Sequence, residues 1–227
     1  MENITYLGVF LVEILSLFFF SRLLTQSIGR ILHRLTGNFD QAAQLFSILF
    51  LPGTIVHEMA HILMAGALLV PTGEVEFTPK LEEGRLKLGS AQIGQTDPIR
   101  RALIGVSPVI FGLLLILVSL YLITNSYQSF YDSWWLGIPA VYLIFVVANS
   151  MFSSPKDLEG TIEVLCVVVG AFVAGYLLNL YQPIQVLGSL MASPVGAMIK
   201  SATIYLLIPI LIDLGVFFSA ALLLKRR

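Results

Sequence analysis

The sequence predicts an all-α polytopic membrane protein with about six transmembrane helices and a small β-hairpin between the second and the third. The first observation is composition: 57% of the 227 residues are hydrophobic and 12% are charged, whereas soluble domains carry about 25% charged residues. The second is that the apolar residues gather in runs of roughly 20, the length at which a helix crosses a bilayer. The third is a polar, strand-like segment between two of these runs.

Six apolar runs predict the spans, approximately Tyr6–Leu24, Ala43–Val70, Ala102–Thr124, Trp134–Ser153, Ile162–Tyr181 and Thr203–Leu224. The first run lacks the basic region and cleavage site of a signal peptide, so we expect it to be retained. The chain then divides into residues 1–42, with the first span and an amphipathic segment, residues 43–160, which form the core, and residues 161–227, with two C-terminal spans.

The distribution of Lys and Arg predicts the orientation of these spans. If the N-terminus is cytoplasmic, nine of the 13 basic residues fall on the inside and four on the outside, in agreement with the positive-inside rule. We therefore expect a multi-pass protein of the cell membrane with both termini in the cytoplasm. Residues Thr25–Gly37 place two arginines on the outside, and their apolar residues, spaced three and four apart, predict an interfacial amphipathic helix.

The polar segment between the second and third runs predicts a hairpin. Residues 74–78 and 85–88 alternate between polar and apolar side chains, and a Glu-Glu-Gly sequence at 82–84 separates them. Asp97 followed by Pro98 is typical of the start of a helix, here the third span.

Charge and cysteine content exclude other classes. The formal net charge of −1 gives no basis for binding nucleic acid. The single cysteine, Cys166, can form neither an intramolecular disulfide nor a thiolate zinc site. The lipid bilayer is the expected environment, and no pattern specifies an oligomeric state.

The second run contains His57-Glu58-Met59-Ala60-His61, an H-E-x-x-H sequence within a predicted helix. Residues four apart share one face of a helix, so both imidazoles can bind one Zn²⁺. Glu58 lies about 100° round the helix, where it can take a proton from a zinc-activated water and pass it to the leaving amine. The alternative is that the motif occurs by chance. Two observations argue against chance: two of the three histidines form the motif, and a charged residue such as Glu58 within a bilayer costs about 2.5–3.5 kcal/mol and so needs a partner.

A catalytic zinc usually has a third protein ligand. Asp157 is the first candidate, because it follows Pro155, a residue that disturbs helices, and by the predicted topology it faces the same side as the end of the H-E-x-x-H helix. Asp157 could instead cap the fifth helix. The other candidate ligands are Glu159, Glu163 and His33.

These residues resemble the site-2 protease family of intramembrane zinc metalloproteases. The resemblance rests on H-E-x-x-H inside a span and on a later Asn…Pro…Asp…Gly pattern, here Asn149, Pro155, Asp157 and Gly160. In that family the aspartate of the later motif is the third zinc ligand, which implies this role for Asp157. The family's usual Leu-Asp-Gly ending is altered here, which keeps Glu159 open as a ligand. The hairpin resembles the family's β-element, which pairs with an unwound substrate.

Other polar residues lie within the predicted spans. Glu13 and Asp213 are expected either to line a path for water or substrate or to be hydrogen-bonded between helices. Asn149 is a candidate catalytic residue that would contact a zinc ligand or the oxyanion, with an interhelical hydrogen bond as the alternative. Gly105 and Pro108 predict a kink in the third span near the site, or close packing.

We therefore expect a Zn²⁺-dependent intramembrane endopeptidase that acts on transmembrane protein substrates, with His57, His61 and Asp157 as metal ligands and Glu58 as the base. One alternative is a membrane-anchored gluzincin-type metalloprotease with a glutamate as third ligand. The other is a non-enzymatic metal-binding scaffold or transporter, in which replacing Glu58 by Gln would leave function intact.

Overall fold

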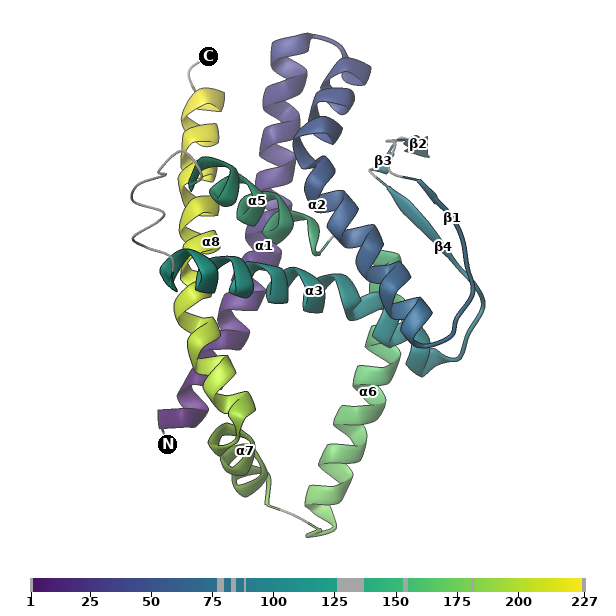
Figure 1. Ribbon diagram of the computed structural model, residues 1–227, viewed down its shortest axis with the longest axis vertical. Coiled ribbons are helices and arrows are strands. Elements are labelled where there is room, and N and C mark those ends of the chain that lie inside the picture. The colour runs from purple at the N-terminus through teal and green to yellow at the C-terminus, as the bar shows by residue number, and fades with distance from the viewer. Residues whose placement is uncertain are drawn as a thin grey trace.

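A computed structural model describes residues 2–76, 80–82, 85–87, 89–125, 137–152, 155–180 and 182–225. The chain is mainly helical, with one β-hairpin projecting from the helices (Figure 1). Its elements are α1 (Glu2–Thr36), α2 (Phe39–Ala67), β1 (Thr72–Glu76), β2 (Lys80–Glu82), β3 (Arg85–Lys87), β4 (Ser90–Ile93), α3 (Pro98–Asn125), α5 (Gly137–Ser150), α6 (Pro155–Leu177), α7 (Pro183–Ala192) and α8 (Pro194–Lys225).

Four helices in the described part of the chain are long and apolar enough to cross a membrane. The shorter helix α5 (Gly137–Ser150) and the apolar part of α6, Cys166–Leu177, correspond to the expected fourth and fifth spans. The first of these has 14 residues, or about 21 Å at 1.5 Å per residue, less than the roughly 30 Å of a hydrocarbon core. The architecture is therefore that of an all-α membrane protein with a hairpin, as predicted, and the described residues contain four long candidate spans. The four long segments are Thr5–Thr36, Phe39–Ala67, Pro98–Ile123 and Pro194–Leu222.

α1 continues without a break through the segment expected to form a separate interfacial helix. Hydroxyl groups in this part bond back onto the helix: Thr25 Oγ1 donates to the Ser21 carbonyl and Ser27 Oγ to the Leu23 carbonyl, both at 2.8 Å. The helix ends at Gly37, whose φ of 64° is easily adopted by glycine. With 35 residues α1 is about 52 Å long, so the segment extends the first span instead of lying apart from it.

α1 and α8 run side by side in the same direction. Near their first turns, the Lys200 ammonium lies 5.0 Å from the centre of the Tyr6 ring, and the two chain ends lie at opposite ends of the long axis (Figure 1). α8 begins at Pro194, earlier than the expected Thr203, after the unpredicted helix α7. If both long helices cross the bilayer, the termini face opposite sides, which differs from the expected arrangement.

α5 lies at the centre of the helices. Each residue from Ile144 to Ser150 is buried, as expected of a helix surrounded by other helices. Its apolar residues pack with Leu17 of α1, Ile116 of α3 and Leu206 of α8. The end of α5 is therefore held within the protein, beside the helix that carries H-E-x-x-H.

The structure has a hairpin between α2 and α3, as predicted, but its strands pair differently from the expected residues 74–78 and 85–88, of which 77, 78 and 88 lie outside the described residues. β1 pairs with β4 in antiparallel orientation and β2 pairs with β3, with Glu82 opposite Arg85 across the tip. The chain then enters α3 as predicted, since the Asp97 carboxylate accepts a hydrogen bond from the Arg100 backbone N–H at 3.0 Å. This bond holds the pKa of exposed Asp97 below its usual value, and the nearby Arg100 side chain lowers that pKa further.

Candidate functional site

The three polar residues of H-E-x-x-H lie on the buried face of α2. His57, Glu58 and His61 retain only 5%, 7% and 4% exposure. The buried residues of α2 recur every three or four positions, from Ala42 to Ala65, and the motif falls within this stripe. The side chains therefore face the protein interior, as their spacing predicts.

The two histidine rings converge through their Nε2 atoms, which lie 3.2 Å apart. On the other side of its ring, His61 Nδ1 lies 2.9 Å from the Ile104 carbonyl of α3. A carbonyl only accepts hydrogen bonds, so Nδ1 carries the proton and donates it. In a neutral imidazole this leaves the lone pair on Nε2, the atom that faces His57.

The distance between the two Nε2 atoms fits two ligands of a single metal ion. Zinc–nitrogen bonds of about 2.0–2.1 Å at a tetrahedral angle separate two nitrogen ligands by about 3.3–3.4 Å, close to the 3.2 Å between the Nε2 atoms. A hydrogen bond from Nδ1 to a backbone carbonyl is also the usual way in which a metal-binding histidine is oriented. Within the described residues, no group of three or more His, Cys, Asp or Glu side chains forms a complete metal site.

The candidate third ligands belong to the first turns of α6. A Cβ at Gly53 would overlap the Val146 carbonyl and the Ser150 hydroxyl, so this glycine allows α5 to pack against α2 one turn before His57. Asp157 follows seven residues after Ser150, in the first turn of α6, and α6 packs against α3. α3 is also the helix whose Ile104 carbonyl contacts His61. The side chains of Asp157, Glu159 and Glu163 lie outside the described part of the structure.

The Glu58 carboxyl group lies against the hairpin. A Cβ at Gly89, just before β4, would lie 3.1 Å from both Cγ and Oε1 of Glu58 and 2.9 Å from Cγ2 of Thr54. Only a residue without a side chain fits there while the neighbours keep their positions. The hairpin backbone therefore borders the carboxyl group that is the candidate base.

Asn149 does not use its amide group at the histidines. Its Nδ2 donates to the Phe145 carbonyl at 2.9 Å and to Oδ1 of Asp213 at 2.7 Å, so both of its N–H groups are occupied. This is the interhelical hydrogen bond that was the alternative to a catalytic contact, and it joins α5 to α8. Glu13 is also buried, and neither of its carboxyl oxygens has a hydrogen-bond partner in the described structure.

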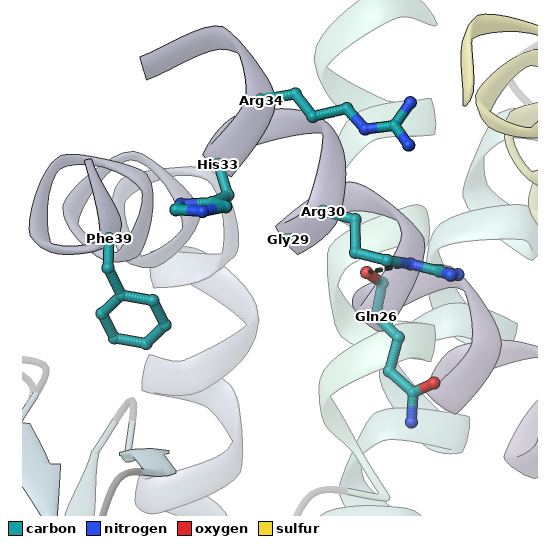
Figure 2. A pocket seen from close by; sticks show the side chains of 6 residues that line it. All are labelled: Gln26, Gly29, Arg30, His33, Arg34 and Phe39. Atoms are coloured by element: carbon teal, nitrogen blue, oxygen red, sulfur yellow. Dashed lines mark hydrogen bonds between the residues drawn. The ribbon is translucent and has the colours of Figure 1, made fainter. Parts of the chain in front are cut away.

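His33 lies far from the other two histidines. It lines a groove of about 520 Å³ at the end of α1, and its ring contacts Phe39 with the ring centres 6.4 Å apart. Figure 2 shows the ring pointing to one side of α1 while Arg30 and Arg34 point to the other. Phe39 precedes His57 by 18 residues of continuous helix, or about 27 Å. His33 is therefore not a ligand of the His57–His61 pair.

Comparisons with protein families, with curated proteins and with solved structures find no match for this chain.

Proposed function

We propose that the protein is an intramembrane zinc endopeptidase that cleaves transmembrane protein substrates. His57 and His61 would hold the metal, together with a carboxylate from the start of α6, for which Asp157 is preferred over Glu159. When bound, the zinc would supply Lewis-acid polarisation of the scissile carbonyl and acidify water. Glu58 would accept a proton as general base and return it to the leaving amine.

One observation carries this proposal: two buried histidine Nε2 atoms lie 3.2 Å apart on a helix long and apolar enough to span a membrane. Buried polar groups in such a helix are costly and are commonly functional. The spacing suits two ligands of one metal ion, and a buried glutamate stands between them in the sequence. The resemblance of the two motifs to site-2 proteases supports the same activity.

The position of the hairpin supports a peptide substrate. A helical substrate must be unwound before its peptide bonds can be reached, and an exposed strand edge can hold an extended chain by β-augmentation. β1 and β4 form a two-stranded sheet among the described residues, so each has an edge without a neighbouring strand there. Because Gly89 borders both β4 and Glu58, a substrate strand added at β4 would reach the candidate base.

The decisive experiment compares Glu58→Gln with wild type in detergent or reconstituted lipid, measuring zinc content and cleavage of a model transmembrane substrate. General acid–base catalysis contributes roughly 10²–10⁴-fold, so we expect the variant to keep its zinc and lose at least about 100-fold in turnover. Asp40→Asn is the matched control, because Asp40 is an exposed acid in the first turn of the same helix. Full cleavage by Glu58→Gln would exclude the peptidase and favour a metal-binding scaffold or transporter.

The third ligand is identified by metal content alone. We expect about one zinc per chain in wild type and in Glu159→Ala, and loss of zinc in Asp157→Ala. Loss with Glu159→Ala instead would indicate a glutamate ligand, as in gluzincins.

We further propose that the two termini face opposite sides of the membrane. The parallel α1 and α8 place the C-terminus at the same end of the molecule as the α1–α2 turn, and the N-terminus lies at the other end (Figure 1). Reporter fusions at each terminus test this orientation: signals from the same compartment would restore the arrangement predicted from the sequence.

A further inference from the structure

We infer that Pro108 is a positioning residue for the metal ligand His61, because it leaves the Ile104 carbonyl free to hold the imidazole. The inference rests on the proposed zinc site and assigns a role to a proline in a different helix. Pro108 lies inside α3 and is fully buried. It is neither a candidate ligand nor a candidate base.

The argument starts from helix geometry. In an α-helix the N–H of residue i donates to the carbonyl of residue i−4, so the donor for Ile104 would come from residue 108. Proline has no N–H. The Ile104 carbonyl therefore has no partner of this kind within its own helix. In an apolar helix a carbonyl without a partner is costly, and neighbouring groups usually satisfy it.

Two side chains donate hydrogen bonds to the Ile104 carbonyl in place of the missing N–H. Ser107 Oγ donates to the Ile104 carbonyl at 2.6 Å, and His61 Nδ1 lies 2.9 Å from the same oxygen. A carbonyl oxygen has two lone pairs, so these two donors fill its capacity. An N–H restored at residue 108 would compete with them. The histidine is the more distant donor and belongs to another helix, so its bond is the one that the competition would weaken.

The bond decides which nitrogen of His61 is available. While Nδ1 donates to Ile104, the Nε2 lone pair faces His57 Nε2 at 3.2 Å. Without the carbonyl, the ring could exchange its tautomer or rotate. Groups that orient a metal ligand in this way typically contribute about 10–100-fold to metal affinity. The missing N–H of Pro108 thus acts on the metal site through Ile104.

The test measures Zn²⁺ affinity of the full-length protein by competition with a chelator, with no substrate present. Pro108→Ala restores the N–H, and we expect zinc to bind about 10–100-fold more weakly. Replacement of Pro108 by lactic acid removes the ring but adds an ester oxygen instead of an N–H, and we expect nearly wild-type affinity. Pro209→Ala is the control, since Pro209 is equally buried inside α8, and it should leave affinity unchanged.

Several outcomes would overturn the inference. One is wild-type affinity in a folded Pro108→Ala protein. Another is an equal loss in the lactic acid variant, which would mean that the ring and not the missing N–H matters. If Pro108→Ala does not fold, weaker zinc binding by the folded lactic acid variant still overturns the inference, and wild-type affinity of that variant supports it. Absence of zinc binding in wild type, or binding unaffected by His57→Ala, would instead refute the metal site itself.

Discussion

Two buried polar pairs lie within the apolar helices, and they differ in how their hydrogen-bonding groups are used. The imidazoles of His57 and His61 direct their Nε2 atoms at each other, and a backbone carbonyl holds one ring from behind. Asn149 Nδ2 instead donates a hydrogen bond to Oδ1 of Asp213 at 2.7 Å, and its second N–H donates to the Phe145 carbonyl of the same helix. In the first pair two ring nitrogens with the geometry of metal ligands face each other, whereas the second pair joins two helices. A polar residue in a predicted span is therefore not by itself evidence of catalysis.

The largest expected difference between the pairs is in metal content. We expect His57→Ala to abolish zinc binding, because one remaining imidazole cannot hold the ion. Asn149→Ala should keep about one zinc per chain, since its amide bonds to Asp213 and Phe145. Metal analysis of the two purified variants beside wild type checks both expectations. Zinc loss in Asn149→Ala at unchanged thermal stability would mean that the second pair also belongs to the metal site.

The contact between α2 and α5 provides the next prediction. Gly53→Ala would push a methyl group into the Val146 carbonyl and the Ser150 hydroxyl. We expect destabilisation of about 1–3 kcal/mol, the usual cost of overpacking. Gly66→Ala in the same helix is the matched control, because nothing lies within 4 Å of the added Cβ. That change should stabilise the helix by up to about 1 kcal/mol. Thermal unfolding in detergent measures both, and equal midpoints would argue against close packing at Gly53.

The contact between Gly89 and Glu58 should affect turnover more than metal binding. A methyl group at Gly89 would meet Glu58 Oε1 at 3.1 Å, which requires a shift of a few tenths of an ångström. Because a misplacement of about 1 Å can cost 10²-fold, we expect Gly89→Ala to lower turnover on the order of 10-fold while zinc content stays unchanged. Gly73→Ala, in the paired strand, meets the flexible side chain of Gln92 and should retain activity. Wild-type turnover by Gly89→Ala would mean that the contact between the hairpin and Glu58 does not affect the catalytic step.

The sequence predicts those features of the site that depend on local geometry. His57, Glu58 and His61 share one region of α2 because helical periodicity places them there, and the hairpin follows from alternation and its turn. The Ile104 carbonyl and the Gly89 contact depend on how distant segments pack, which no local pattern specifies. Pro108 did carry a signal, as a residue that disturbs a helix, but its partner is visible only once α2 and α3 are placed together.

The relative direction of the first and last helices is the part of the fold that the sequence predicts least. The count of basic residues assumes six crossings and so places both termini on one side. The structure has a 14-residue α5, an unpredicted α7 and a parallel α1 and α8. Apolar length alone does not distinguish a helix that crosses the bilayer from one that is short and surrounded by protein. The second half of α5 is buried on all sides. Most of its residues are therefore apolar, on every side of the helix, as in a transmembrane helix, which explains why the sequence predicts a span there.

The smallest expected effect concerns the hydrogen bond between Asn149 and Asp213. Such bonds between membrane helices contribute on average about 0.6 kcal/mol, and up to about 1.7. Asn149→Ala should lower stability by an amount in this range, and Asp213→Asn should lower it less, because an amide can still accept from Nδ2 of Asn149. A double-mutant cycle with Asn149→Ala and Asp213→Ala, measured by unfolding in detergent, isolates the coupling between the two side chains. Zero coupling would mean that apolar packing alone holds α5 against α8. The two polar pairs would then differ only in whether they bind a metal ion.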